Sequence, residues 1–147
     1  MATTRRTRTI ATPIDRLWET LSDPHHLPRW WPRVERVEEV TGDAFTEVLR
    51  AASGRSVRAD FELVQIDPDT RHVHWAQQLQ GTPFARVLRS SEVEIRLAPA
   101  APDATEVTLE LHQTLAGFLP RLGSFLARRA AARTLEEALE DLERIGG

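Results

Sequence analysis

The sequence predicts an α+β fold in which a curved antiparallel sheet carries one long C-terminal helix across its concave side. Between Arg33 and Leu115, apolar and polar residues alternate along successive segments joined by short turns, which is typical of antiparallel strands with one solvated face. From Phe118 to Gly147, leucines recur at helical spacing with acidic residues largely opposite them. A sheet with one apolar face needs a cover, and this amphipathic helix can supply it.

The chain starts with a β-compatible segment, residues 3–11, followed by a short helix that ends at Asp23-Pro24. Thr12 is suited to the N-cap and Pro13 to the first helical position, while Asp15 completes a capping box. The apolar stripe of this helix consists of Ile14, Leu17, Trp18 and Leu21.

Three prolines, at positions 24, 28 and 32, punctuate the next segment, so it is predicted to be a compact connector with one tight turn. Because the adjacent Trp30 and Trp31 cannot both face one direction, we expect one in the core and the other at a rim.

Six strands are predicted from the alternation that follows. The residues expected on the inward faces of the last four are Val57, Ala59, Phe61 and Leu63; Val73, Trp75, Gln77 and Leu79; Ala85, Val87, Arg89, Ser91, Val93, Ile95 and Leu97; and Val107, Leu109, Leu111, Gln113 and Leu115.

The C-terminal helix changes its apolar face near residue 127. Its second half presents Leu135, Leu139 and Leu142, and the same face upstream is small or polar. Either the helix breaks or kinks around Gly123, or its first half faces a cavity, a ligand or a partner.

Composition limits the function classes. With 147 residues, 41% of them hydrophobic, we expect a single globular domain over residues 1–147, and no stretch is typical of a secretory signal or a membrane span, so a cytoplasmic location is expected. The chain has no cysteine, which excludes disulfides and thiolate chemistry. All 19 basic residues are arginine, but the net charge of −3 and the small cluster at positions 5, 6 and 8 do not indicate nucleic-acid binding.

Several segments together resemble a known family. They are Ile10-Ala11-Thr12-Pro13-Ile14-Asp15-Arg16-Leu17-Trp18, Leu21-Ser22-Asp23-Pro24, Trp30-Trp31-Pro32, Asp67-Pro68 with Arg71, and Ala104-Thr105-Glu106-Val107-Thr108. The chain resembles, over essentially its whole length, the polyketide cyclase/dehydrase-like branch of the SRPBCC (START-like, birch-pollen-allergen-like) superfamily. The resemblance implies the helix-grip fold, a seven-stranded curved antiparallel sheet wrapped around a long C-terminal helix with an internal apolar cavity.

That superfamily includes aromatase/cyclases, lipid and hormone carriers and chaperone activators. Its motifs are caps, turns and core positions, so they report the fold more than the function. Cyclase-type members often carry arginine and tyrosine in the cavity, and this chain contains no tyrosine.

The candidate ligand-binding residues are the polar and aromatic side chains predicted to face the cavity. They are Trp30, Trp31, Phe61, Trp75, Gln77, Arg89, Ser91, Gln113, Phe125 and Arg128. An inward arginine must be paired or must face water or a ligand, so Arg89 either pairs within the fold or anchors a carboxylate or carbonyl group. Small residues on the helix, such as Ala127 and Ala131, are compatible with a hollow core.

The five histidines do not form a recognisable metal site. His72 and His74 share the outward face of one strand, His112 is also outward, and His25 and His26 lie in the connector. We therefore expect no metal and no cofactor, no catalytic residue is assigned, and a histidine general base stays open.

Three functions remain open. The first is binding of a small hydrophobic or amphipathic molecule in the cavity, as a carrier or sensor. The second is a cyclase, aromatase or dehydratase acting on a hydrophobic carbonyl compound. The third is a protein-interaction module that uses the Phe118–Leu126 surface. The chain is expected to be a monomer or homodimer.

Overall fold

The computed structural model describes residues 2–117 and 121–146. The elements, in chain order, are β1 (Ala2–Ile10), α1 (Ile14–Ser22), the 3₁₀ turn η1 (Pro24–His26), α2 (Leu27–Trp30), β2 (Val34–Glu38), β3 (Ala44–Arg50), β4 (Ser56–Asp67), β5 (His72–Gln78), the 3₁₀ turn η2 (Pro83–Arg86), β6 (Leu88–Ala101), β7 (Ala104–Leu115) and α3 (Arg121–Ile145). Across these two ranges no helix combines the length and the apolar character that crossing a membrane requires.

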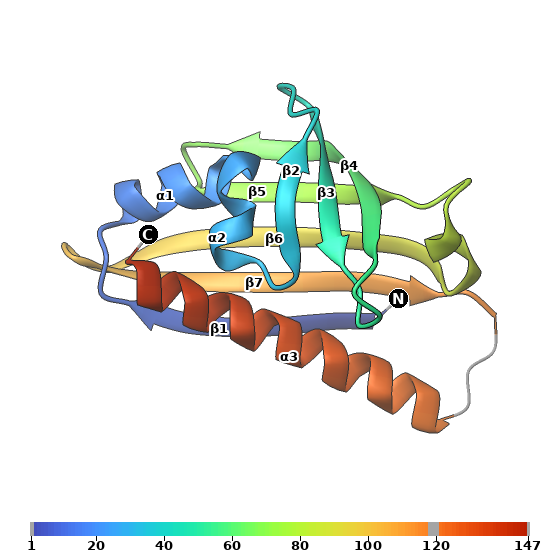
Figure 1. Ribbon diagram of the computed structural model, residues 1–147. Coiled ribbons are helices and arrows are strands. Elements are labelled where there is room, and N and C mark those ends of the chain that lie inside the picture. The colour runs from blue at the N-terminus through green and yellow to red at the C-terminus, as the bar shows by residue number, and fades with distance from the viewer. Residues whose placement is uncertain (1, 118–120, 147) are drawn as a thin grey trace.

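The strands form one antiparallel sheet in the order β1-β7-β6-β5-β4-β3-β2. The sheet curves strongly, so that in Figure 1 β2 and β3 stand across the direction of β6 and β7, while α3 runs alongside β1. Helix α3 contacts β1, β7 and α2. The predicted helix-grip fold, with its six strands after the connector, is confirmed.

The core lies between the concave face of the sheet and the second half of α3. The predicted alternation is confirmed in β4, where Ala59 and Phe61 are buried, and in β7, where Val107 and Leu109 are buried. Of the two adjacent tryptophans, Trp30 is 1% exposed and belongs to the core, whereas Trp31 is half-buried beside it, with the two rings edge to face at 5.5 Å. The expected division between core and rim is therefore present.

The predicted N-cap of α1 is wrong. Helix α1 begins at Ile14 with Pro13 as its N-cap, and no side chain caps it. Thr12 is buried instead, and its backbone carbonyl accepts a 2.7 Å hydrogen bond from the Thr105 hydroxyl group on β7. Asp15, expected in the capping box, pairs with Arg71. Tertiary contacts thus replace the local cap that the sequence pattern indicates.

The start of β6 also differs from the prediction. Ala85 belongs to η2 and Val87 is exposed, so the strand begins only at Leu88. Its register with β7 shifts between Leu88 and Ser90. A bulge of this kind breaks the alternation, because one extra residue changes the face to which its neighbours point. Arg89, predicted inward, is exposed.

Helix α3 is continuous from Arg121 to Ile145, so it does not break at Gly123. Its first half faces away from the core instead, which leaves Leu122, Phe125 and Leu126 exposed. Phe118 and Pro120, part of the predicted helix, lie outside the described residues.

The two halves of α3 should therefore respond differently to the same substitution. Leu142 is 0% exposed, so Leu142→Ala removes buried methyl groups, leaves a cavity and is expected to lower the free energy of unfolding by about 2 to 5 kcal/mol. Leu122 is 67% exposed, and Leu122→Ala should change it by less than about 0.5 kcal/mol. Urea unfolding followed by tryptophan fluorescence measures both. Equal effects would contradict this description of the helix.

Candidate ligand-binding cavity

A cavity of about 350 Å³, here called the main cavity, opens between the concave face of the sheet, η2 and α3. It is lined mainly by apolar side chains, which include Trp31, Leu49, Val57, Ala59, Phe61, Phe84, Val93 and Leu111. The polar side chains at its wall are Arg33, Glu47, Arg50, Gln77, Ser91, Gln113 and Thr134. The volume and the mostly apolar lining are typical of a small-molecule site.

A smaller inner pocket of about 20 Å³ adjoins the main cavity, with which it shares Trp31, Glu47, Phe61 and Val93. Aromatic rings dominate its wall, because Phe45 stacks on Phe61 at 5.1 Å and meets Trp75 edge to face at 4.6 Å. This pocket holds little more than one water molecule. It therefore extends the wall of the main cavity rather than forming a separate site.

Glu47 is an ionisable side chain at the wall of the main cavity that was not among the predicted site residues. It lies on β3 between the inward residues Phe45 and Leu49, pairs in register with Ala59 and is 6% exposed. Within the described part of the chain, no side chain or backbone group forms a hydrogen bond or ion pair with its carboxyl group. Burial raises the pKa of Glu47 from an ordinary value of 4.5 to about 8.

At neutral pH the Glu47 carboxyl group is thus mainly protonated and can donate a hydrogen bond into the cavity. Because its pKa lies near neutrality, it can also release and take up a proton under physiological conditions. An unpaired carboxyl group in an apolar wall costs stability, so its position marks a place where a bound molecule can satisfy it.

Three further polar side chains line the same space. The side-chain nitrogen of Gln77 on β5 is buried and has no partner among the described residues. Ser91 on β6 is buried opposite Gln113 on β7, and both side chains line the main cavity. Together with protonated Glu47, these groups present hydrogen-bond donors to an acceptor oxygen within an apolar enclosure.

The structure places the ten candidate residues in three groups. Trp31, Phe61, Gln77, Ser91 and Gln113 line the main cavity, while Trp30 and Trp75 line the inner pocket. Arg89, Phe125 and Arg128 do not line the main cavity.

Arg89 faces outward because of the bulge in β6, and Phe125 lies on the exposed side of α3. Arg128 is exposed on α3 and borders a second pocket of about 80 Å³ together with Ser124, Ala127 and Ala131, and this pocket shares Gln113 with the main cavity. The small-residue face of the helix therefore borders a hollow, but this hollow is not the main cavity. Arg89 and Arg128, both predicted to face the ligand cavity, therefore do not line the main cavity.

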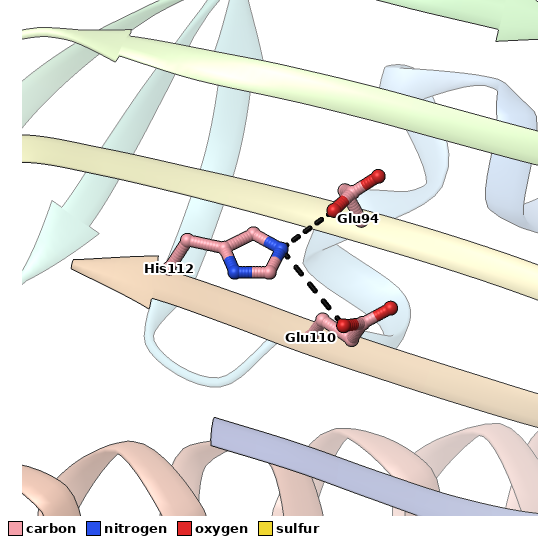
Figure 2. A group of neighbouring side chains, drawn as sticks. All are labelled: Glu94, Glu110 and His112. Carbon is pink, nitrogen blue, oxygen red and sulfur yellow. Dashed lines mark hydrogen bonds and ion pairs between the residues drawn. The ribbon is translucent and has the colours of Figure 1, made fainter. Parts of the chain in front are cut away.

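The histidines predicted to face outward do so, and they form part of a cluster on the convex face. Figure 2 shows the His112 ring directed towards Glu94 on β6 and Glu110 on β7. The His112 Nε2 atom lies 2.6 Å from a Glu94 oxygen and 4.0 Å from a Glu110 oxygen. His72 lies 2.7 Å from the other oxygen of Glu94.

Potential ligand atoms of Glu94, Glu110 and His112 lie within 4.8 Å of one another, a spacing that a metal ion could bridge. The arginines around them favour a different interpretation. Arg5 and Arg96 both pair with Glu110 and so neutralise the carboxylate that a cation would need.

For Glu94, partial burial raises the pKa, but hydrogen bonds from His72 and His112 together with the nearby charge of Arg96 hold the pKa below its usual range. The cluster is therefore an ion-pair network that ties β5, β6, β7 and β1 together.

Comparison with known proteins shows the family to which this chain belongs. The family model described as polyketide cyclase / dehydrase and lipid transport matches residues 1–145. No curated protein matches the sequence.

Solved structures share the fold at low sequence identity. A START superfamily protein from Mycobacterium smegmatis is 16% identical, with a TM-score of 0.75 over 96% of this chain and 94% of that one. The Zhui aromatase/cyclase from Streptomyces sp. R1128 is 17% identical, with a TM-score of 0.72 over 99% and 90% of the two chains. The di-domain ARO/CYC BexL from the BE-7585A biosynthetic pathway is 17% identical, with a TM-score of 0.81 over 98% of this chain and 46% of that chain.

The raised pKa of Glu47 predicts a specific pH dependence. Between pH 4.5 and about 8 the unfolded chain releases the Glu47 proton while the folded chain keeps it, so stability falls as the pH rises through this interval. Glu47→Gln removes this dependence. The free energy of unfolding of the variant minus that of the wild type should therefore increase by about 1.4 kcal/mol per pH unit across the interval. Above the interval this difference should become constant.

Urea unfolding at a series of pH values measures this difference. Glu62→Gln, a change at an exposed position of the neighbouring strand β4, is the matched control and should follow the wild-type profile. Parallel profiles for wild type and Glu47→Gln would show that Glu47 titrates normally in the folded protein.

Proposed function

Because this chain belongs to the polyketide cyclase/dehydrase and lipid transport family, we propose that it binds a small hydrophobic or amphipathic molecule in the main cavity, as a carrier or sensor. The apolar walls contribute most of the affinity by removing apolar surface from water. The few polar groups at the wall orient the ligand.

The unpaired carboxyl group of Glu47 carries this proposal. A chain that needed only a stable core would have an apolar side chain between Phe45 and Leu49, since burying an unpaired carboxyl group lowers stability. A ligand that accepts a hydrogen bond from Glu47 offsets this cost in the bound state. Gln77 and Ser91 can share the same ligand oxygen or bind a second one.

A cavity-filling variant tests the binding function. Ala59 lies on the inward face of β4 and lines the main cavity, so Ala59→Phe should occupy part of its volume and weaken ligand binding by about tenfold or more. The probe is N-phenyl-1-naphthylamine, an uncharged apolar dye, and its fluorescence together with quenching of the nearby tryptophans reports binding. The control, Val64→Phe, changes an exposed position of the same strand and should leave binding unchanged. Failure of the wild-type protein to bind the dye saturably, with no lipophile seen by native mass spectrometry, would refute the proposal.

Glu47 also favours a second candidate function, acid–base catalysis on a hydrophobic carbonyl compound. A carboxyl group with a pKa of about 8 in an apolar site is suited to transfer protons to or from a bound substrate at neutral pH. Such chemistry underlies cyclisation and dehydration of compounds that contain several carbonyl groups.

Proton exchange on a hydrophobic β-diketone in deuterated water distinguishes the enzyme from the carrier. An enzyme with Glu47 as its base should accelerate exchange at the carbon between the two carbonyl groups, and Glu47→Gln should lose most of this acceleration while it still binds the diketone. NMR measures the exchange. A carrier would bind the diketone without accelerating exchange, and Glu47→Gln would then change only the affinity.

A further inference from the structure

A groove of about 450 Å³ on the surface lies between α3 and the turn that joins α2 to β2. Its charged side chains are Arg33, Arg129, Arg133 and Glu137, and we call it the arginine groove. The groove shares Pro32, Arg33 and Thr134 with the main cavity. It therefore adjoins the main cavity, and it has no lining residue in common with the pocket that Arg128 borders.

Three positive charges meet one negative charge in this groove. Arg129 and Arg133 are one turn apart on α3, and Arg33 comes from a distant part of the sequence. Glu137 lies 3.4 Å from Arg133. Neither Arg33 nor Arg129 forms an ion pair with any of the described residues, so the groove keeps an excess of positive charge.

The turn that carries Arg33 is held in one conformation by its backbone. Arg33 adopts a φ of +68°, a left-handed conformation that costs a non-glycine residue free energy. Its carbonyl oxygen accepts a 2.9 Å hydrogen bond from the Arg50 amide on β3, which holds the turn in place. Like charges one helical turn apart, at Arg129 and Arg133, also disfavour the helix slightly. An anion between these guanidinium groups relieves the repulsion.

The groove is also partly apolar. Pro32, Leu126 and Ala130 line it between the arginine side chains. A bound molecule can therefore place a charged group against the arginines and continue along an apolar wall towards the main cavity. Planar guanidinium groups bind carboxylate and phosphate oxygens in paired hydrogen bonds, so these anions fit the groove chemically.

From the adjacency of the two spaces, which share three lining residues, and from the excess of arginine, we propose that the arginine groove binds the carboxylate or phosphate end of an amphiphile whose apolar part occupies the main cavity. This inference rests on the proposed binding function and names the chemical class of the ligand. It assigns the anion site to Arg33, Arg129 and Arg133 and not to Arg89 or Arg128.

The test compares parinaric acid, a naturally fluorescent polyene fatty acid, with its uncharged methyl ester. The wild-type protein should bind the acid about tenfold or more tightly than the ester, because only the acid forms charge-assisted hydrogen bonds with the groove. Added salt should weaken binding of the acid and leave that of the ester nearly unchanged. Fluorescence titration at concentrations below micelle formation gives both dissociation constants.

Variants of α3 locate the site. The double variant Arg129→Gln, Arg133→Gln should bind the acid and the ester almost equally, with the affinity for the ester unchanged. Arg128→Gln is the matched control, because this neighbouring arginine is also exposed but lies outside the groove, and the preference for the acid should remain. Circular dichroism checks that each variant keeps its fold.

Three competitors separate the possible sources of the anion. Lysophosphatidic acid should displace parinaric acid if phosphate heads are accepted as well as carboxylates, and a monoacylglycerol should compete more weakly. Inorganic phosphate alone should compete poorly, since it lacks the apolar part. Equal competition by inorganic phosphate and lysophosphatidic acid would overturn the proposal by showing a site for free anions.

The remaining outcomes keep the two proposals apart. Equal affinity of the wild type for acid and ester overturns the anion site and leaves cavity binding intact, whereas binding of neither probe overturns the binding function itself. Sedimentation with phosphatidylglycerol vesicles that requires Arg129 and Arg133, without any preference for free acid over ester, would overturn the proposal by assigning the groove to a membrane surface.

Discussion

The packing of one half of α3 against the sheet determines the rest of the structure. Leu135, Leu139 and Leu142 are almost fully buried, and the helix contacts β1, β7 and α2. Because this interface fixes the helix from Ala131 onwards, the first half needs no core contacts of its own. The same helix can therefore close the core with its second half and border the cavity mouth and the arginine groove with its middle.

The sheet contributes the complementary constraint. Its curvature leaves space on the concave side that the side chains of α3 do not fill. The carboxyl group of Glu47 is buried on that face. The convex face instead carries an ion-pair network in which Glu94 and Glu110 bridge neighbouring strands. Buried or half-buried pairs of this kind contribute through hydrogen bonds as well as charge. The concave face is thus left free to hold a hollow while the convex face and the helix interface maintain the fold.

The sequence predicted the elements and most of their faces, because alternation and helical periodicity depend only on nearby residues. It failed where distant parts of the chain intervene. A bulge in β6 turned Arg89 outward, and the contact between Thr12 and Thr105 replaced a local cap. Glu47 could have been found, since it shares the face of Phe45 and Leu49 in the same strand. The arginine groove could not, because tertiary packing alone brings Arg33 to the same groove as Arg129.

Glu47 in the wall of the main cavity and the arginines of the adjoining groove also bear on how a ligand would be oriented. Under the proposed functions, an anionic amphiphile that entered the main cavity with its charged end first would place its carboxylate near Glu47 and against apolar side chains. Desolvation of that carboxylate opposes this orientation, and proximity to a second acid opposes it further once Glu47 ionises. The opposite orientation keeps the anion among exposed arginines and presents neutral oxygens to protonated Glu47. Specificity then arises as much from the orientation that the cavity disfavours as from the contacts it offers.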